Sequence, residues 1–339
     1  MKKLMTAAGV ALSGLLLWLA IKDTSFVEIS ASFRDANAFL AAPLLLAAAG
    51  FYFLKAWRWS DILAPTARIG VGGLVPSMMS GAAGNNLLPA HMGELVRTYL
   101  LGREYRLPKV GVLATLVAER VFDIVGVLLL LSGTLFFADV SPGTRPAVLF
   151  LLIVAVAGTI FMYLAVKHAD AFQAILHARS GRWPPAIRRK AGAVALHITS
   201  GFGAVRERRL FARILANSVA QWLLMSVCIH FALRALAIDV PFHASIIVLA
   251  IIVAGLSLPT SPGFLGTIQY CFVLGLSQFG VDASRALAAS FFYHTLLWFS
   301  VTGTGLYFLH KYRLSFAGIR DLGRQEARQQ PDGESDERR

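Results

Sequence analysis

Two long apolar segments of the sequence are interrupted by proline and glycine, and they occupy corresponding places in its two halves. They span residues 71–101 and 245–280. The interruptions superpose Pro89 on Pro262 and Gly93 on Gly266. Interrupted hydrophobic segments in matching positions indicate half-helices that meet near the middle of a bilayer. Each segment is therefore expected to form a re-entrant hairpin, which enters the membrane and returns to the same side.

Composition places the chain in a membrane. Of its 339 residues, 56% are hydrophobic and only 15% are charged, whereas soluble domains contain about 25% charged residues. A helix that crosses the hydrocarbon core needs about 20 mainly apolar residues. Six segments are candidates: residues 4–21, 38–54, 110–138, 147–166, 210–236 and 286–310. The expected fold is an all-α polytopic membrane protein with six full spans and two re-entrant hairpins.

The distribution of Lys and Arg predicts the orientation. Three connecting stretches are rich in these residues and are assigned to the cytoplasm: residues 55–70, 97–109 and 167–209. Three others are charge-poor or balanced and are assigned outside: residues 22–37, 139–146 and 237–243. The first hairpin then starts and ends in the cytoplasm, and the second starts and ends outside. The two halves, about 1–138 and 147–312, therefore form an inverted repeat with both termini cytoplasmic.

The same bias accounts for the net charge of +13, so no nucleic-acid partner is expected. The first apolar run is interpreted as a membrane anchor and not as a cleaved signal, because no small-residue cleavage site precedes Lys22. Residues 313–339 have almost no apolar side chains and are expected to be a disordered cytoplasmic tail. Trp57 and Trp59 are expected to form an interfacial anchor at the end of the second span.

The first interruption carries the richest set of polar residues. Glu94 falls in the first turn of the returning half-helix, where a carboxylate is favoured. It is expected to pair with Arg97 at i+3, either as a purely structural ion pair or beside a lipid headgroup. Amide side chains are expected to satisfy the backbone groups freed by the break. The candidate residues are Asn85, Asn86, Pro89, His91, Gly93, Glu94 and Arg97.

A second set lies within the third expected span. Glu119 and Asp123 are four residues apart and share a helix face, with Arg120 beside them. Ionisable side chains within a span are costly and usually face the bundle interior. Two interpretations are open at this point: a hydrated path or headgroup contact, and a placement near the cytoplasmic interface.

The second interruption supplies the partner of the first and again presents a half-helix N-terminus, an end that attracts phosphate or carboxylate. The last expected span is expected to bring further polar groups nearby. The candidates are Pro262, Gly263, Gly266, Thr267 and Gln269, with Tyr293 and His294. No phosphate-binding loop, metal-ligand spacing or nucleophile–base pattern occurs in the sequence. No cofactor, metal or catalytic residue is therefore expected.

Three motifs carry a family resemblance: N-x-x-P-x-x-x-G-E-x-x-R from Asn86 to Arg97, A-E-R-x-x-D from Ala118 to Asp123, and P-x-x-P-G-x-x-G-T from Pro259 to Thr267. With them the chain resembles the flippase-like family typified by the transmembrane region of lysylphosphatidylglycerol synthases. It resembles a stand-alone member without a synthase domain. The chain departs from many members at Ala90-His91 and at Gln269, so an acidic role is not transferred to position 269.

The resemblance implies a helical bundle with re-entrant hairpins that moves a phospholipid or related lipid between leaflets of the bacterial inner membrane without ATP. The headgroup, anionic or phosphate-bearing, is expected between the two half-helix N-termini. The alternatives are a lipid-modifying membrane enzyme, a component of a hopanoid or polyprenyl-lipid pathway, and a non-catalytic partner of a lipid synthase. A homo-oligomer is also open.

Overall fold

A computed structural model describes residues 2–88, 92–137, 207–257 and 260–312, with isolated helical positions between 153 and 160. These parts form helices and contain no strand. Several expectations fall outside the described residues. They concern Pro89, His91 and Pro259, the span expected at 147–166, nearly all of the basic stretch 167–209, and the tail 313–339.

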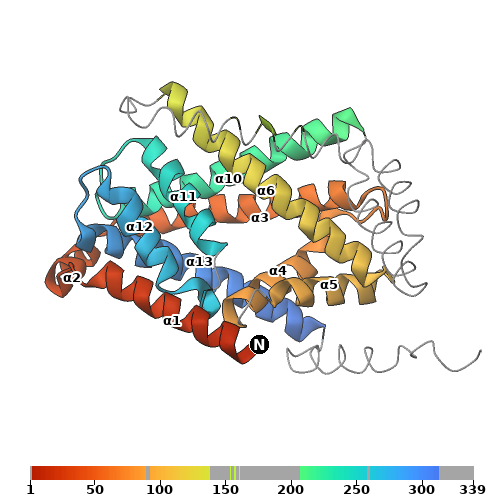
Figure 1. Ribbon diagram of the computed structural model, residues 1–339, viewed down its shortest axis with the longest axis horizontal. Helices are drawn as coiled ribbons and strands as arrows, with labels where there is room; N and C mark the ends of the chain where they lie inside the picture. Colours follow the sequence, from red (N-terminus) through yellow and green to blue (C-terminus); the bar gives the residue numbers. More distant parts are fainter. Residues whose placement is uncertain are drawn as a thin grey trace, which may run out of the picture.

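The first half follows the expected order of two long helices, an interrupted pair and a third long helix. Its elements are α1 (Lys2–Ile21), α2 (Phe26–Arg34), the 3-10 turn η1 (Ala38–Leu40), α3 (Ala41–Leu63), α4 (Val71–Leu87), α5 (Gly93–Glu104) and α6 (Lys109–Phe137). The second half contains α10 (Arg208–Ala235), α11 (Phe242–Leu256), the 3-10 turn η4 (Pro262–Phe264), α12 (Thr267–Ser277) and α13 (Ala283–Lys311). Figure 1 shows how these helices pack.

Two helical stretches in the described residues are long and apolar enough to cross a membrane: 38–63, formed by η1 and α3, and α10. A third is added if α1 and α2, which bend by 80° at the break between them, make one span. The chain is therefore an all-α, multi-pass membrane protein. Residues 22–37, expected as a plain connection, contain α2.

The second span is longer than its expected limit of residue 54. No proline or glycine interrupts it between Gly50 and Pro65, so α3 continues to Leu63. Trp59 is consequently buried inside the protein, where its indole N–H donates to Thr115 Oγ1 of α6 at 3.0 Å. The expected interfacial anchor is thus wrong for Trp59, while Trp57 is exposed.

The loops expected outside gather at one end of the bundle. The Asn37 N–H donates to the carbonyl of Ala235 at 2.8 Å, which joins the start of α3 to the end of α10. The Ser25 N–H donates to Ser284 Oγ at 3.0 Å and brings α2 to the start of α13. In Figure 1, α2 lies at the left beside the beginning of α13.

Stretches expected in the cytoplasm meet at the opposite end. The Arg213 side chain donates to both carboxylate oxygens of Asp61, with Nε at 2.8 Å, so the start of α10 lies at the end of α3. The Tyr312 hydroxyl donates to Glu104 at 3.2 Å and joins the ends of α13 and α5. The fold therefore separates the two groups of loops that the Lys and Arg counts distinguish.

The apolar core lies on both sides of α3. The larger cluster joins α3 and α10 to α11, α12 and α13, with Leu44, Ile229, Val248, Phe272 and Ala289 among its buried members. A smaller cluster packs the C-terminal half of α3 against α4, α5 and α6. The charged residues described below lie beside this second cluster.

Candidate functional site

The first interrupted segment folds back on itself as a tight hairpin of α4 and α5. A Cβ atom at Gly73 would overlap the Tyr105 hydroxyl, so the start of α4 lies beside the end of α5. At the other end, the Asn85 side-chain oxygen accepts a hydrogen bond from the Gly93 N–H at 2.8 Å. This confirms, for Asn85, that an amide side chain satisfies a backbone group freed by the break. Gly93 allows the close crossing, because a Cβ there would overlap the carbonyl oxygen of Gly81.

The second interrupted segment also returns to the end where it begins, since the rings of His243 in α11 and Phe279 after α12 lie 5.6 Å apart. Gly266 has φ +86°, a conformation open to glycine, and its N–H donates to Gln269 Oε1 at 2.8 Å. The Gln269 amide nitrogen lies 3.1 Å from Nδ1 of His294. Gln269 and His294 are therefore buried partners that shape the break.

The two interruptions lie against each other. Gly263 has φ +71° and lies close to both Asn86 and Trp298. A Cβ atom added there would be 3.2 Å from the Asn86 carbonyl oxygen and 2.9 Å from Trp298 Nε1. The Asn86 amide donates to Thr302 of α13 at 2.9 Å. One helix, α13, thus contacts the first hairpin through Thr302 and the second through His294.

The side chains of two other candidates near the second break, Tyr293 and Thr267, form no hydrogen bond with the first hairpin in the described part of the chain. Tyr293 points away from the break, because its hydroxyl donates to the sulfur of Met225 in α10 at 3.1 Å. Thr267 is buried at the first position of α12, and its hydroxyl has no hydrogen-bond partner among the described residues. Pro262 begins the η4 turn beside them.

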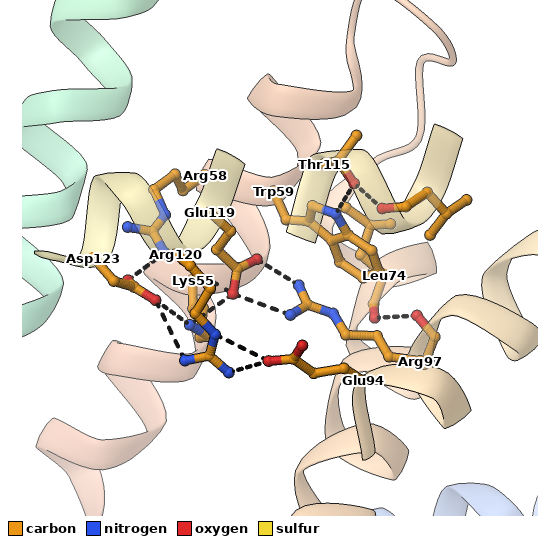
Figure 2. A network of polar contacts seen from close by, with 12 residues as sticks. Lys55, Arg58, Trp59, Leu74, Glu94, Arg97, Thr115, Glu119, Arg120 and Asp123 are labelled. Atoms are coloured by element: carbon orange, nitrogen blue, oxygen red, sulfur yellow. Dashed lines mark hydrogen bonds and ion pairs between the residues drawn. The ribbon is translucent and has the colours of Figure 1, made fainter. Parts of the chain in front are cut away.

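The charged residues of α5 and α6 form one network, with partners other than those expected from the sequence (Figure 2). Arg97 does not pair with Glu94. It makes a two-pronged contact with Glu119, at 3.0 and 2.7 Å, while Glu94 pairs with Arg120. Glu119 belongs to the neighbouring helix α6, and its two carboxylate oxygens accept from the two terminal nitrogens of Arg97. Two parallel hydrogen bonds of this kind are stronger than a local i+3 ion pair. Glu94 and Arg97 of the first candidate set therefore share one site with Glu119, Arg120 and Asp123 of the second.

Two further cations from α3 complete this network, and sequence reasoning assigned them to a loop. Lys55 Nζ lies 2.8 Å from Glu119 and 3.5 Å from Asp123. Arg58 donates to Asp123 at 2.6 Å and to Ser218 of α10 at 2.9 Å. The uninterrupted stretch up to Pro65 was the available signal that both residues belong to the second span.

The network is held in a protein environment with little access to solvent. The Arg58 side chain is 0% exposed, and Glu119 and Asp123 are also buried. The Arg97 guanidinium carbon lies 3.6 Å from the centroid of the Trp59 ring, a stacking arrangement that favours arginine. We call this set of seven residues the ionic network: Lys55, Arg58, Glu94, Arg97, Glu119, Arg120 and Asp123.

Comparison with known proteins identifies the family of the chain. Residues 6–305 match the family described as the lysylphosphatidylglycerol synthase TM region. The chain belongs to this family. The match contains both hairpins and every residue of the ionic network. No solved structure matches the chain significantly.

Three curated relatives of the chain are distant in sequence. The chain is 25% identical over 331 residues to a protein named glycosyltransferase AglD from Haloferax volcanii, which covers 87% of this chain. The chain spans about half of that relative, 52% of its length. It is 24% identical over 267 residues to a UPF0104 membrane protein of Methanothermobacter thermautotrophicus, covering 74% of this chain and 78% of the relative. A UPF0104 membrane protein of Methanocaldococcus jannaschii, MJ1078, is 23% identical and covers 64% and 88%.

Proposed function

We propose that the protein moves a phospholipid or related lipid between the leaflets of the cytoplasmic membrane, without ATP. The proposal includes an arrangement of six full spans and two re-entrant hairpins in an inverted repeat. Support comes from the two hairpins, each of which has both of its ends together, and from the contact of Gly263 with Asn86 where their tips meet. The separation of basic and charge-poor loops to opposite ends supports cytoplasmic termini.

The observation that carries the proposal is the position of the ionic network, whose central side chains, Arg58, Glu119 and Asp123, are buried among the helices. Arg120 lies about 17 Å along α6 from Lys109, and Glu94 lies about 15 Å along α5 from Glu104, at ~1.5 Å per residue. The hydrocarbon core is about 30 Å thick. Along α3 the distance is shorter, because Arg58 lies about 4.5 Å and Lys55 about 9 Å from Asp61 at the same rise per residue, and the Asp61–Arg213 pair marks the end where the basic stretches meet. The network therefore lies inside the bundle, on the side of the basic stretches. Charges there are costly and typically mark the path of a polar substrate.

In this mechanism the network replaces the water around a lipid headgroup as the headgroup crosses the hydrocarbon core. Arg97 and Arg120 provide positive charge, while Glu94, Glu119 and Asp123 hold those cations in place. The breaks at Gly93 and Gly266 place backbone dipoles near the same depth. The acyl chains remain in lipid throughout, so only the headgroup needs a polar path.

The test is reconstitution in liposomes that contain a fluorescent phosphatidylglycerol in both leaflets. Dithionite added outside quenches only the outer leaflet, so translocation appears as loss of the protected inner half of the fluorescence. We expect near-complete quenching in vesicles that contain the protein and about half in empty vesicles. Quenching equal to that of empty vesicles, for anionic and zwitterionic headgroups alike, would exclude translocation.

A second candidate function is a lipid-modifying enzyme, which the relative named as a glycosyltransferase favours. It would use Glu119 or Asp123 as a base. Each carboxylate already pairs with two or more cations, so neither can act as a base without first giving up an ion pair. This alternative predicts a new lipid mass when the purified protein is incubated with a lipid extract and sugar donors, whereas translocation leaves every lipid mass unchanged.

A further inference from the structure

Arg120 interrupts an otherwise apolar face of α6. The exposed side chains on that face follow the helical period: Val110, Leu113, Val117 and Ile124. On a helix within a bilayer such a stripe faces the acyl chains. Arg120 lies in the middle of it, with a side chain that is 52% exposed. An arginine in this position directs a charged group at lipid.

The Glu94–Arg120 pair is the outermost layer of the ionic network (Figure 2). Glu94 is 29% exposed, whereas Glu119 and Asp123 behind it are 3% and 5% exposed. Leu95, the residue after Glu94, is exposed on α5. A path from the lipid to the buried cations therefore passes this one ion pair between α5 and α6.

The network also lacks one negative charge among the described residues. It contains four cations, Lys55, Arg58, Arg97 and Arg120, against three carboxylates. Each cation touches a carboxylate, but a net positive charge in a largely buried cluster is unfavourable until an anion balances it. In addition, Nε of Arg97 is buried and has no hydrogen-bond partner among the described residues. Both observations favour an anionic ligand with several acceptor oxygens.

We propose that the phosphodiester of a membrane lipid reaches the ionic network sideways from the bilayer, between α5 and α6, with Arg120 as its first contact. The phosphate takes the place of the Glu94 carboxylate on Arg120 and supplies the missing negative charge. The acyl chains stay outside, against Leu95 and Val117. This inference rests on the proposed function and adds the direction of access and the residue that selects phosphate.

Photolabelling in vesicles tests this access independently of transport. The probe is phosphatidylglycerol with a diazirine on the acyl carbons nearest the glycerol, and the control probe is diacylglycerol with the same diazirine. We expect phosphatidylglycerol to label peptides of α5 and α6 around Leu95 and Val117. Arg120→Gln should lower this labelling about tenfold, the usual effect of losing a charge-assisted hydrogen bond, and leave diacylglycerol labelling unchanged.

Arg213 provides the matched control. It is 55% exposed and also pairs with a carboxylate, that of Asp61, but it lies near the start of α10 and away from the ionic network. Arg213→Gln should leave phosphatidylglycerol labelling unchanged. If Arg120→Gln and Arg213→Gln have the same effect, lateral access at Arg120 is wrong. Should Arg120→Gln fail to fold, Leu95→Trp and Val117→Trp must still reduce labelling by covering the Glu94–Arg120 pair, with Val110→Trp as their control.

Free phosphate carries the same charged oxygens as the lipid phosphodiester. A competition experiment with inorganic phosphate distinguishes the two ligands. Inorganic phosphate at millimolar concentration should leave the labelling unchanged, because the pair lies within an apolar stripe. Competition by inorganic phosphate would place the site in contact with water and overturn lateral access. Labelling at Arg120 without translocation in liposomes would instead reject the proposed function, so the two failures are distinguishable.

Discussion

Replacing Glu119 by Gln is expected to lower the free energy of unfolding by about 3–5 kcal/mol, because it leaves buried cations without their partner. Glu119 holds Arg97 through two hydrogen bonds and Lys55 at 2.8 Å. Glutamine has nearly the same shape but no charge, so it preserves packing and removes only the electrostatic partner. Reversible unfolding in detergent micelles, followed by circular dichroism, measures the loss.

The control for Glu119→Gln is Asp239→Asn. Asp239 pairs with Arg234 on the surface, where both side chains are exposed, and such pairs contribute about 0–1 kcal/mol. A double variant adds a second check: Arg97→Met with Glu119→Leu removes both charges and should recover part of the stability. A loss for Glu119→Gln no larger than that for Asp239→Asn would contradict the buried network.

Gly266→Ala is the second substitution with a large expected effect. Two costs add at this position, because φ is +86° and because the new Cβ would overlap the carbonyl oxygen of Ser13 in α1. A strained backbone costs about 1–3 kcal/mol, and overpacking adds about 1–3 kcal/mol. We expect a total loss of about 2–6 kcal/mol in the same unfolding experiment, by simple addition of these terms.

Gly280 separates the two contributions to the Gly266→Ala result. It also has positive φ, +69°, but a Cβ there meets nothing within 4 Å. Gly280→Ala should therefore cost only the conformational part, about 1–2 kcal/mol. Equal losses at the two positions would mean that α1 does not pack closely against the second break.

The hairpins could be predicted because their cause is local. A helix that contains proline and glycine close together is weakened locally, although a single proline is tolerated within α4 at Pro76. Asn85 supplies the side-chain acceptor that the freed Gly93 N–H requires. The order of elements follows from the apolar pattern alone. Boundaries were less predictable: α3 runs to Leu63 because its charged residues, Lys55 and Arg58, find buried partners that hydropathy does not reveal.

The ion pairs could not be predicted from spacing. Glu94 and Arg97 are separated by one helical turn, which favours a local pair of about 0.2–0.5 kcal/mol. Tertiary packing brings Glu119 and Arg120 from α6 to the same place, and each residue takes a partner from the other helix. Trp59 illustrates the same limit, since its burial depends on Thr115 of a helix that the sequence pattern does not relate to it.

Accessibility of single cysteines from the two sides of the membrane tests the central claim most directly. Cys228 and Cys271 are buried and are first replaced by Ala. Single cysteines then mark both ends of each hairpin at exposed positions: Gly72→Cys and Arg103→Cys for the first, Asp239→Cys and Gln278→Cys for the second. A membrane-impermeant maleimide should label the first pair from the cytoplasmic side only and the second pair from outside only. Labelling of the two ends of either hairpin from opposite sides would contradict the account, because that segment would then cross the membrane.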